Sequence, residues 1–171
     1  MPLKISVDVN SRSQRWTLAD ARAIKRAVQK TLHGFLPAKT TAHVQLSVTL
    51  STNNYVKRLN TEWRGKQKPT NILSFPAGEL ENIKTWPAKL PLPLGDLVLG
   101  HEICVRESKQ FGIRLHHHLM HLAVHGTLHL LGYDHETDAD HRKMLRAELR
   151  VLYKLGLANP YPFMQNSPRN V

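Results

Sequence analysis

The sequence predicts an α+β fold, and two patterns carry that prediction. Four short segments either alternate apolar and polar residues or are apolar throughout, as strands do, while longer segments repeat apolar residues every three or four positions, as helices do. The 171 residues are 41% hydrophobic and show no internal repeat. This suits one domain with a single core, which we expect over residues 1–157, followed by a loosely structured tail over residues 158–171.

Strand signals occur in four segments. Residues 3–9 and 44–50 alternate apolar and polar side chains, which is typical of strands buried on one face. Residues 71–75 predict a short third strand, at the edge of the sheet because prolines flank it. Residues 96–99 predict a buried fourth strand. Between these two, residues 76–94 hold four prolines and predict a long surface loop close to the substrate.

Helix signals fall between and after these strands. Thr17 and Thr52 are candidate N-caps, because a threonine hydroxyl accepts from the free N–H groups of a first helical turn. Thr137, with Asp140 three residues later, resembles a capping box. The expected helices cover residues 18–33, 53–59, 103–110, 114–131 and 138–155, with residues 60–70 as a polar, basic loop.

Residues 121–135 carry the chemistry. His125 and His129 are four apart, which places both imidazoles on one face of a helix, one turn apart. Gly132 supplies a helix stop, after which the chain folds back and brings His135 to the same point. Three converging imidazoles predict a site for one Zn²⁺ per chain, with a fourth position open, as in catalytic sites.

The spacing matches the extended zincin pattern H-E-x-x-H-x-x-G-x-x-H at every position but one. Gly126 stands where proteases with this pattern carry the glutamate that serves as general base. The metal ligands are therefore kept while the protease base is missing. This indicates water activation on a different substrate, or a base supplied from elsewhere.

Other side chains near the motif have open roles. His121 shares the helix face of His125 and can compete as a ligand, although we expect it to line the pocket or support a ligand. Asp134 can accept the N–H of a ligating imidazole or simply close a turn. His116, His117 and His118 point in three directions and cannot all reach one metal, so we expect surface or capping roles.

The charge balance favours a polyanionic partner. Lys and Arg number 24 against 13 Asp and Glu, a net charge of +11, although solubility alone is the simpler explanation. The basic residues cluster, which favours nucleic acid. Candidate RNA contacts in the cluster are Lys57, Arg58, Lys66 and Lys68, around Arg64.

Composition excludes several protein classes. Cys104 is the only cysteine, which rules out an internal disulfide and a cysteine cluster for zinc. No apolar run approaches the roughly 20 residues of a membrane span. The first residues lack the layout of a signal peptide. We therefore expect a cytoplasmic protein without a membrane partner.

Three segments together resemble one family. They are His125–His135 (HGTLHLLGYDH), Arg64–Pro76 and Leu94–Leu99. In this order and at these gaps they resemble the signature blocks of the YbeY-type endoribonucleases, bacterial rRNA-maturation factors, over roughly residues 40–155. Two places depart from the family pattern, namely Gly100-His101 at the end of the fourth strand and the extra histidines at 116–118.

The resemblance implies a zincin-like fold, with a four-stranded mixed sheet, a central metal-bearing helix and several flanking helices. It implies one zinc held by His125, His129 and His135, and a required arginine that falls on Arg64. Residues 1–157 then form a single zinc-hydrolase domain. The implied activity is cleavage of single-stranded RNA in 16S rRNA 3′-end maturation and 70S ribosome quality control, with the ribosome or its small subunit and assembly factors as partners.

Further roles and alternative functions stay open at this point. Arg64 offers a planar set of donors suited to a phosphate, and Ser74 is a candidate pocket residue. Trp63 and Phe75 can stack on bases, although core packing is the commoner use of such residues. The alternative functions are a metzincin-like zinc peptidase lacking the usual Glu base, and a non-catalytic ribosome-assembly factor whose zinc only stabilises the fold.

Overall fold

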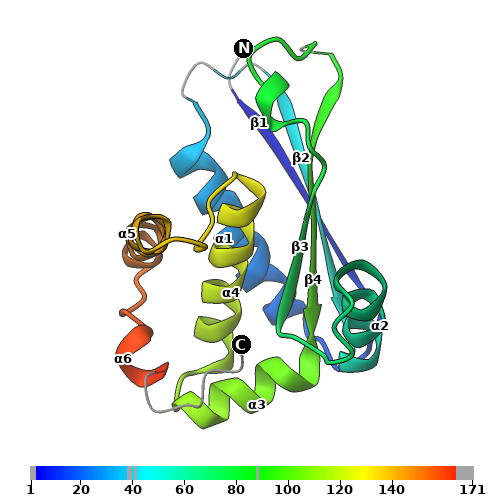
Figure 1. Cartoon of the computed structure of the whole chain (residues 1–171), viewed down its shortest axis with the longest axis vertical. Coiled ribbons are helices and arrows are strands. Elements are labelled where there is room, and N and C mark those ends of the chain that lie inside the picture. The colour runs from blue at the N-terminus through cyan, green and yellow to red at the C-terminus, as the bar shows by residue number, and fades with distance from the viewer. Residues whose placement is uncertain (1–2, 38–39, 41, 88, 165–171) are drawn as a thin grey trace.

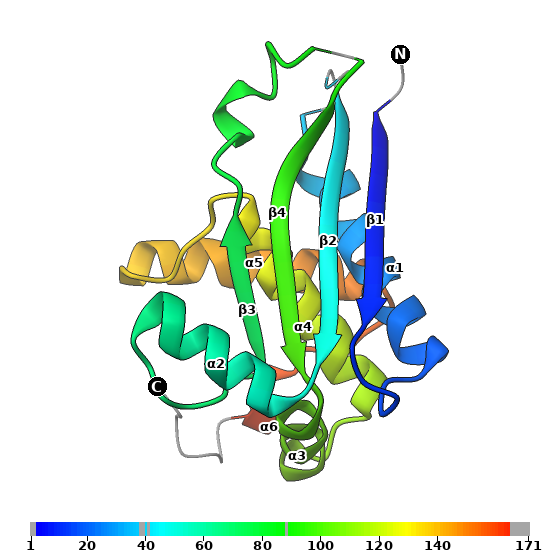
Figure 2. The same ribbon diagram turned by 90° about the vertical axis from the view of Figure 1, so that its right-hand side faces the viewer.

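The computed structural model describes residues 3–37, 40, 42–87 and 89–164. Four strands form one sheet in the order β1-β2-β4-β3. They span Lys4–Ser11 (β1), His43–Ser51 (β2), Ile72–Pro76 (β3) and Pro91–Gly100 (β4). β1, β2 and β4 run parallel, and the short edge strand β3 runs antiparallel to β4 (Figure 2). The predicted α+β fold with a mixed four-stranded sheet is confirmed.

The helices are divided between the two faces of this sheet. They span Leu18–Phe35 (α1), Asn53–Arg64 (α2), His101–Phe111 (α3), Leu115–Leu130 (α4), Asp138–Lys154 (α5) and Tyr161–Met164 (α6), with a 3₁₀ turn, η1, at Leu80–Asn82. In Figure 1, α1, α4 and α5 lie on one side of the sheet and α2 on the other. α4 is the central helix, because it packs against α1, α3, α5 and the strands β3 and β4. None of the described helices is long and apolar enough to cross a membrane.

The three predicted N-caps, Thr17, Thr52 and Thr137, are confirmed. Thr17 and Asp20 form a complete capping box, in which each side chain binds the backbone N–H of the other residue. The hydroxyls of Thr52 and Thr137 accept from the backbone N–H three residues on, at the starts of α2 and α5. These caps are local interactions, so a short stretch of sequence is enough to predict them.

Two predicted boundaries were wrong. α2 continues to Arg64 and ends at Gly65, whose φ of 66° is the left-handed conformation that closes a helix. The extra residues look loop-like in the sequence because most of them are polar. Residues 61–64 are exposed on the helix, while Asn60 is buried and its side-chain amide donates to the Lys68 carbonyl. β4 begins at Pro91, inside the expected loop over residues 76–94. Pro91 and Pro93 are tolerated there because β3 pairs only with the later part of β4, from Gly95 onward.

The segment after α5 falls in the expected tail, residues 158–171. Its first part is described and contains the short helix α6, which lies beside the lower half of α4 in Figure 1. Residues 165–171 lie outside the described part of the chain.

Gly95 lies at an irregularity of the sheet. The register of β2 and β4 shifts there, so Gln45 pairs with Pro93 and Leu46 with Gly95. Gly95 has a φ of 140°, and a Cβ at this position would lie 2.3 Å from the backbone oxygen of Phe75. Only glycine therefore allows β3 to approach β4 this closely.

We expect Gly95→Ala to lower the free energy of unfolding by about 3 kcal/mol, because it combines backbone strain with a clash against a backbone atom. The matched control is Gly34→Ala in α1, where a Cβ meets nothing within 4 Å. That change should leave the stability equal or slightly higher. Urea denaturation of the three proteins measures both effects, and equal stability of Gly95→Ala and wild type would contradict this reading of the sheet.

Candidate metal centre

The end of α4 and the turn after it bring three histidines together. His125 and His129 lie one turn apart on α4. The helix ends at Leu130 with Leu131 as its C-cap, and Gly132 takes a φ of 84° and turns the chain back toward the helix. One ligand nitrogen from each of His125, His129 and His135 lies within 4.8 Å of the other two.

The outer nitrogens of two of these rings are held by acceptors. His125 Nδ1 lies 2.5 Å from the Glu148 carboxylate, and His129 Nδ1 lies 2.9 Å from the backbone oxygen of Tyr133. Both partners are acceptors, so each Nδ1 carries the proton and donates it. The remaining nitrogens, Nε2 of His125 and Nε2 of His129, face each other at 3.1 Å.

This arrangement fits a zinc ion. Two neutral imidazoles protonated at Nδ1 present a lone pair at each Nε2, and two lone pairs at 3.1 Å repel unless a cation binds them. Nitrogen ligands about 2.0–2.1 Å from a tetrahedral zinc lie roughly 3.3 Å apart, close to the observed spacing. With His135 as the third donor, the set matches the ligands of catalytic zinc sites and leaves one coordination position open.

The surroundings keep these groups in the required ionisation states. Burial, together with the neighbouring His125 and His135, lowers the pKa of His129 to about 4, which keeps this ring neutral at pH 7. Burial alone raises the pKa of Glu148, but hydrogen bonds from His121 and His125 outweigh it and hold that pKa well below the usual range. Glu148 is therefore an ionised carboxylate with only 1% of its surface exposed.

Glu148 is a site residue that the sequence interpretation missed. It lies in the middle of α5, on the buried side that also carries Met144, Val151 and Leu152. A glutamate at an inner position of an amphipathic helix is the signal that marks it, because a buried carboxylate needs a partner.

Asp134 was a candidate acceptor for a ligating imidazole or a turn residue, and it accepts a hydrogen bond from the backbone. Its oxygen accepts the backbone N–H of His135 at 2.7 Å, and the residue is exposed. It therefore shapes the turn that carries His135, while Glu148 and the Tyr133 carbonyl hold the imidazoles of the other two rings.

The remaining histidines lie outside the group of three. His121 is buried, and its Nε2 lies 3.4 Å from both the Glu148 carboxylate and the Tyr161 hydroxyl.

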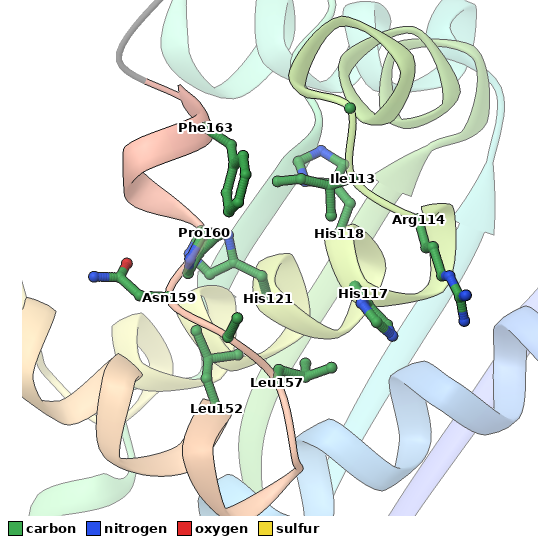
Figure 3. A pocket seen from close by; sticks show the side chains of 12 residues that line it. Ile113, Arg114, His117, His118, His121, Leu152, Leu157, Asn159, Pro160 and Phe163 are labelled. Atoms are coloured by element: carbon green, nitrogen blue, oxygen red, sulfur yellow. The ribbon is translucent and has the colours of Figure 1, made fainter.

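His116 contacts Asp20 at 3.0 Å. The expectation of a surface or capping role was wrong for His118, which is 1% exposed and bonds Glu107 at 2.9 Å. His117, His118 and His121 line a separate cavity of about 230 Å³ beside the first half of α4 (Figure 3).

The packing of α4 on the sheet explains the glycine at the protease-base position. A Cβ at Gly126 would lie 2.7 Å from Ile72 Cδ1 and 2.9 Å from Leu97 Cδ2. The position therefore faces the sheet, where a glutamate side chain has no room. Ser74 of β3 also joins the sheet to α4 at this point, because its hydroxyl donates to the Gly126 carbonyl at 3.3 Å.

Arg64 connects the other face of the sheet to this region. It is the last residue of α2, and its guanidinium donates to the backbone oxygen of Ser74 at 3.4 Å. The arginine thus reaches the edge strand at the residue whose side chain contacts α4. Its side chain is exposed and is free to bind an anion through its other donors.

The expected RNA contacts lie on two surfaces. Lys57 and Arg58 are exposed on α2, on the sheet face opposite α4, and Arg58 lies over the Tyr55 ring at 5.0 Å. Lys66 and Lys68 are exposed on the loop between α2 and β3. None of these four residues lies on α4, whereas Arg64 contacts β3, the strand that packs against α4.

Trp63 differs from the expected core packing. Its side chain is 67% exposed, and its ring meets the Phe75 ring edge-on at 6.4 Å. The prediction was wrong because Trp63 falls on the outer face of α2, a face that polar neighbours make hard to define from sequence.

Comparison with known proteins agrees with this geometry. The family model described as endoribonuclease YbeY matches residues 8–156. The chain belongs to this family. A curated relative from Azorhizobium caulinodans, named endoribonuclease YbeY, is 39% identical over 158 residues, which cover 92% of this chain and 96% of the relative. A second, from Rhodopseudomonas palustris (strain BisA53), carries the same name and is 48% identical over 121 residues, 71% of this chain and 69% of the relative.

A solved structure shows the same fold. The solution structure of TM1509 from Thermotoga maritima aligns with a TM-score of 0.55 at 19% identity, over 97% of this chain and all of that one. The family resemblance stated from the sequence is confirmed by the family model and by these relatives.

The lowered pKa of His129 predicts a pH effect on the metal-free protein. Between pH 6.5 and 4 the unfolded chain takes up a proton on this histidine while the folded chain does not, so the stability falls as the pH drops through this range. Below pH 4 both states carry the proton and the effect ends. His129→Gln removes the titrating group. Chelator-treated wild type should lose stability more steeply than His129→Gln over this range, and parallel curves would contradict the assignment.

Proposed function

We propose that the chain is a zinc-dependent endoribonuclease that cuts single-stranded regions of rRNA. The observation that carries this proposal is the pair of Nε2 atoms 3.1 Å apart, with both Nδ1 atoms occupied and His135 beside them. Family membership supports the reaction, because the matching family model and the relatives are named as endoribonucleases. We extend the proposal to 16S rRNA 3′-end maturation and 70S ribosome quality control.

The proposed division of roles follows from the positions of the residues. His125, His129 and His135 hold the ion. Zinc supplies a Lewis acid that stabilises charge developing on a phosphodiester. Arg64 binds a phosphate oxygen with its planar donors while the Ser74 carbonyl anchors one of its N–H groups.

The surface beside Arg64 suits a single strand of RNA. Trp63 precedes it and exposes 67% of its side chain, which gives a base a ring to stack on. Lys66 and Lys68 follow on the exposed loop and add positive charge for the RNA backbone, as does the net charge of +11. Lys57 and Arg58 then bind RNA that passes around the β3 edge to the other face.

We also infer the cellular setting and the partner of the enzyme. Residues 1–157 act as one zinc-hydrolase domain in the cytoplasm, and the ribosome or its small subunit with assembly factors is the partner. The peptidase alternative is less well supported, because the matching family model and the relatives are named as endoribonucleases and the usual glutamate base has no room at position 126. The non-catalytic alternative predicts ribosome binding without RNA cleavage.

The direct test is cleavage of a single-stranded RNA by zinc-loaded wild type, His125→Ala and Arg64→Lys. We expect each substitution to reduce the cleavage rate about a hundredfold or more, because His125 holds the ion and a lysine cannot supply two parallel donors. Zinc content measured on the same samples should fall below one ion per chain only for His125→Ala. The matched control is Arg22→Ala, an exposed arginine on α1, which should cleave at the wild-type rate.

Two outcomes would overturn this function. Cleavage by His125→Ala at the wild-type rate excludes the metal centre from the reaction. Wild type that binds ribosomal particles and leaves RNA intact favours the non-catalytic assembly factor.

The salt dependence of RNA binding tests the basic loop separately. Each phosphate contact with single-stranded nucleic acid contributes about 0.7 to the slope of log affinity against log salt. Lys66→Ala should reduce that slope by about this amount, while Lys25→Ala, an exposed lysine on α1, should leave it unchanged. Equal slopes for Lys66→Ala and wild type would remove this loop from the RNA-binding surface.

A further inference from the structure

The Glu148 carboxylate has two oxygens with separate partners. One oxygen receives the His125 Nδ1–H at 2.5 Å. The other receives the hydroxyl of Tyr161 and lies 3.4 Å from His121 Nε2. A buried ionised carboxylate is stable only when donors occupy its oxygens, and a second donor also fixes the rotation of the group. The donor to the second oxygen therefore helps to fix the position of the first oxygen, which binds His125.

Tyr161 is suited to be that donor. Its hydroxyl faces a carboxylate that only accepts, so the phenol donates the hydrogen bond. Burial and the neighbouring Glu148 charge raise the pKa of Tyr161 above its usual value, so the phenol keeps its proton at neutral pH. Its ring also packs edge-on against His121, with ring centres 5.4 Å apart.

The chain after α5 holds Tyr161 in this position. Gly156 takes a φ of 77°, and the Leu157 N–H bonds back to Leu152 at the end of α5. The Asn159 side chain then accepts the backbone N–H of Tyr161 at 3.0 Å, at the start of α6. Figure 3 shows Asn159 and Pro160 beside His121, where this segment returns to α4.

We propose that Tyr161 is a positioning residue of the metal centre: its hydroxyl fixes the Glu148 carboxylate, which orients the His125 imidazole and keeps the proton of that ring on Nδ1. The segment after α5 is thereby part of the site, although it lies beyond residue 156, where the family match ends. This inference rests on the proposed zinc centre. Tyr161 touches neither the ion nor the substrate and acts only through Glu148.

The zinc affinity of the purified full chain tests this role, measured by competition with a chromophoric chelator. Removing a group that supports a metal ligand weakens metal binding by about 10- to 100-fold. Glu148→Gln should fall in that range, and Tyr161→Phe, which keeps the ring and loses the hydroxyl, should weaken binding by about tenfold. The matched control is Tyr153→Phe, which removes the hydroxyl of an exposed tyrosine on α5 and should bind zinc as wild type does.

The double variant separates positioning from general support of the fold. If Tyr161 acts through Glu148, adding Tyr161→Phe to Glu148→Gln should cause little further loss, because the carboxylate it fixes is already gone. The visible absorption of the cobalt-substituted proteins gives a second readout, and both single variants should shift the ligand-field bands while Tyr153→Phe should not. Thermal unfolding of the metal-free forms checks that every variant is folded.

The outcomes distinguish the two proposals. Wild type that binds no zinc contradicts the metal centre itself. Wild-type zinc binding with an unchanged affinity in Tyr161→Phe contradicts the positioning role alone. Fully additive losses in the double variant also contradict it, because they show that Tyr161 acts independently of Glu148.

Discussion

The metal centre depends on one buried contact, the hydrogen bond between the His125 imidazole and the Glu148 carboxylate. It joins α4 to α5, and it is 2.5 Å long with the carboxylate removed from solvent. Because Glu148 is ionised and only accepts, it places the proton of His125 on Nδ1 and leaves Nε2 as a ligand atom. The Tyr133 carbonyl places the proton of the His129 ring on Nδ1 in the same way. Both Nε2 atoms therefore have a free lone pair before an ion binds.

The second constraint is the close approach of α4 to the sheet. Gly126 faces Ile72 and Leu97 with no space for a side chain, while the adjacent residue His125 faces α5. One face of α4, at Gly126, therefore packs closely on the sheet, and the face with His125 and His129 carries the metal ligands. The same approach lets Ser74 join β3 to α4. Arg64 of α2 contacts the Ser74 carbonyl from the opposite face of the sheet. The missing protease base is a consequence of the packing of α4 on the sheet.

The sequence predicted features that depend on local spacing. Each of these features involves only a few neighbouring residues. They are the alternation in the strands, the threonine caps and the four-residue interval between His125 and His129. It did not predict Glu148 or Tyr161, because their roles exist only once α5 and the segment after it fold back onto α4. For Trp63 the sequence favoured core packing over stacking, whereas 67% of its side chain is exposed, because polar neighbours on α2 hide which face of that helix is exposed.

X-ray absorption at the zinc edge of the loaded, full-length chain tests the central claim most directly. We expect three imidazole nitrogens and one further light ligand, all at about 2.0–2.1 Å from the ion. The imidazole rings should also give the outer-shell scattering that such ligands produce. Two or fewer imidazoles, or a sulfur ligand from the buried Cys104, would contradict zinc binding by His125, His129 and His135 together.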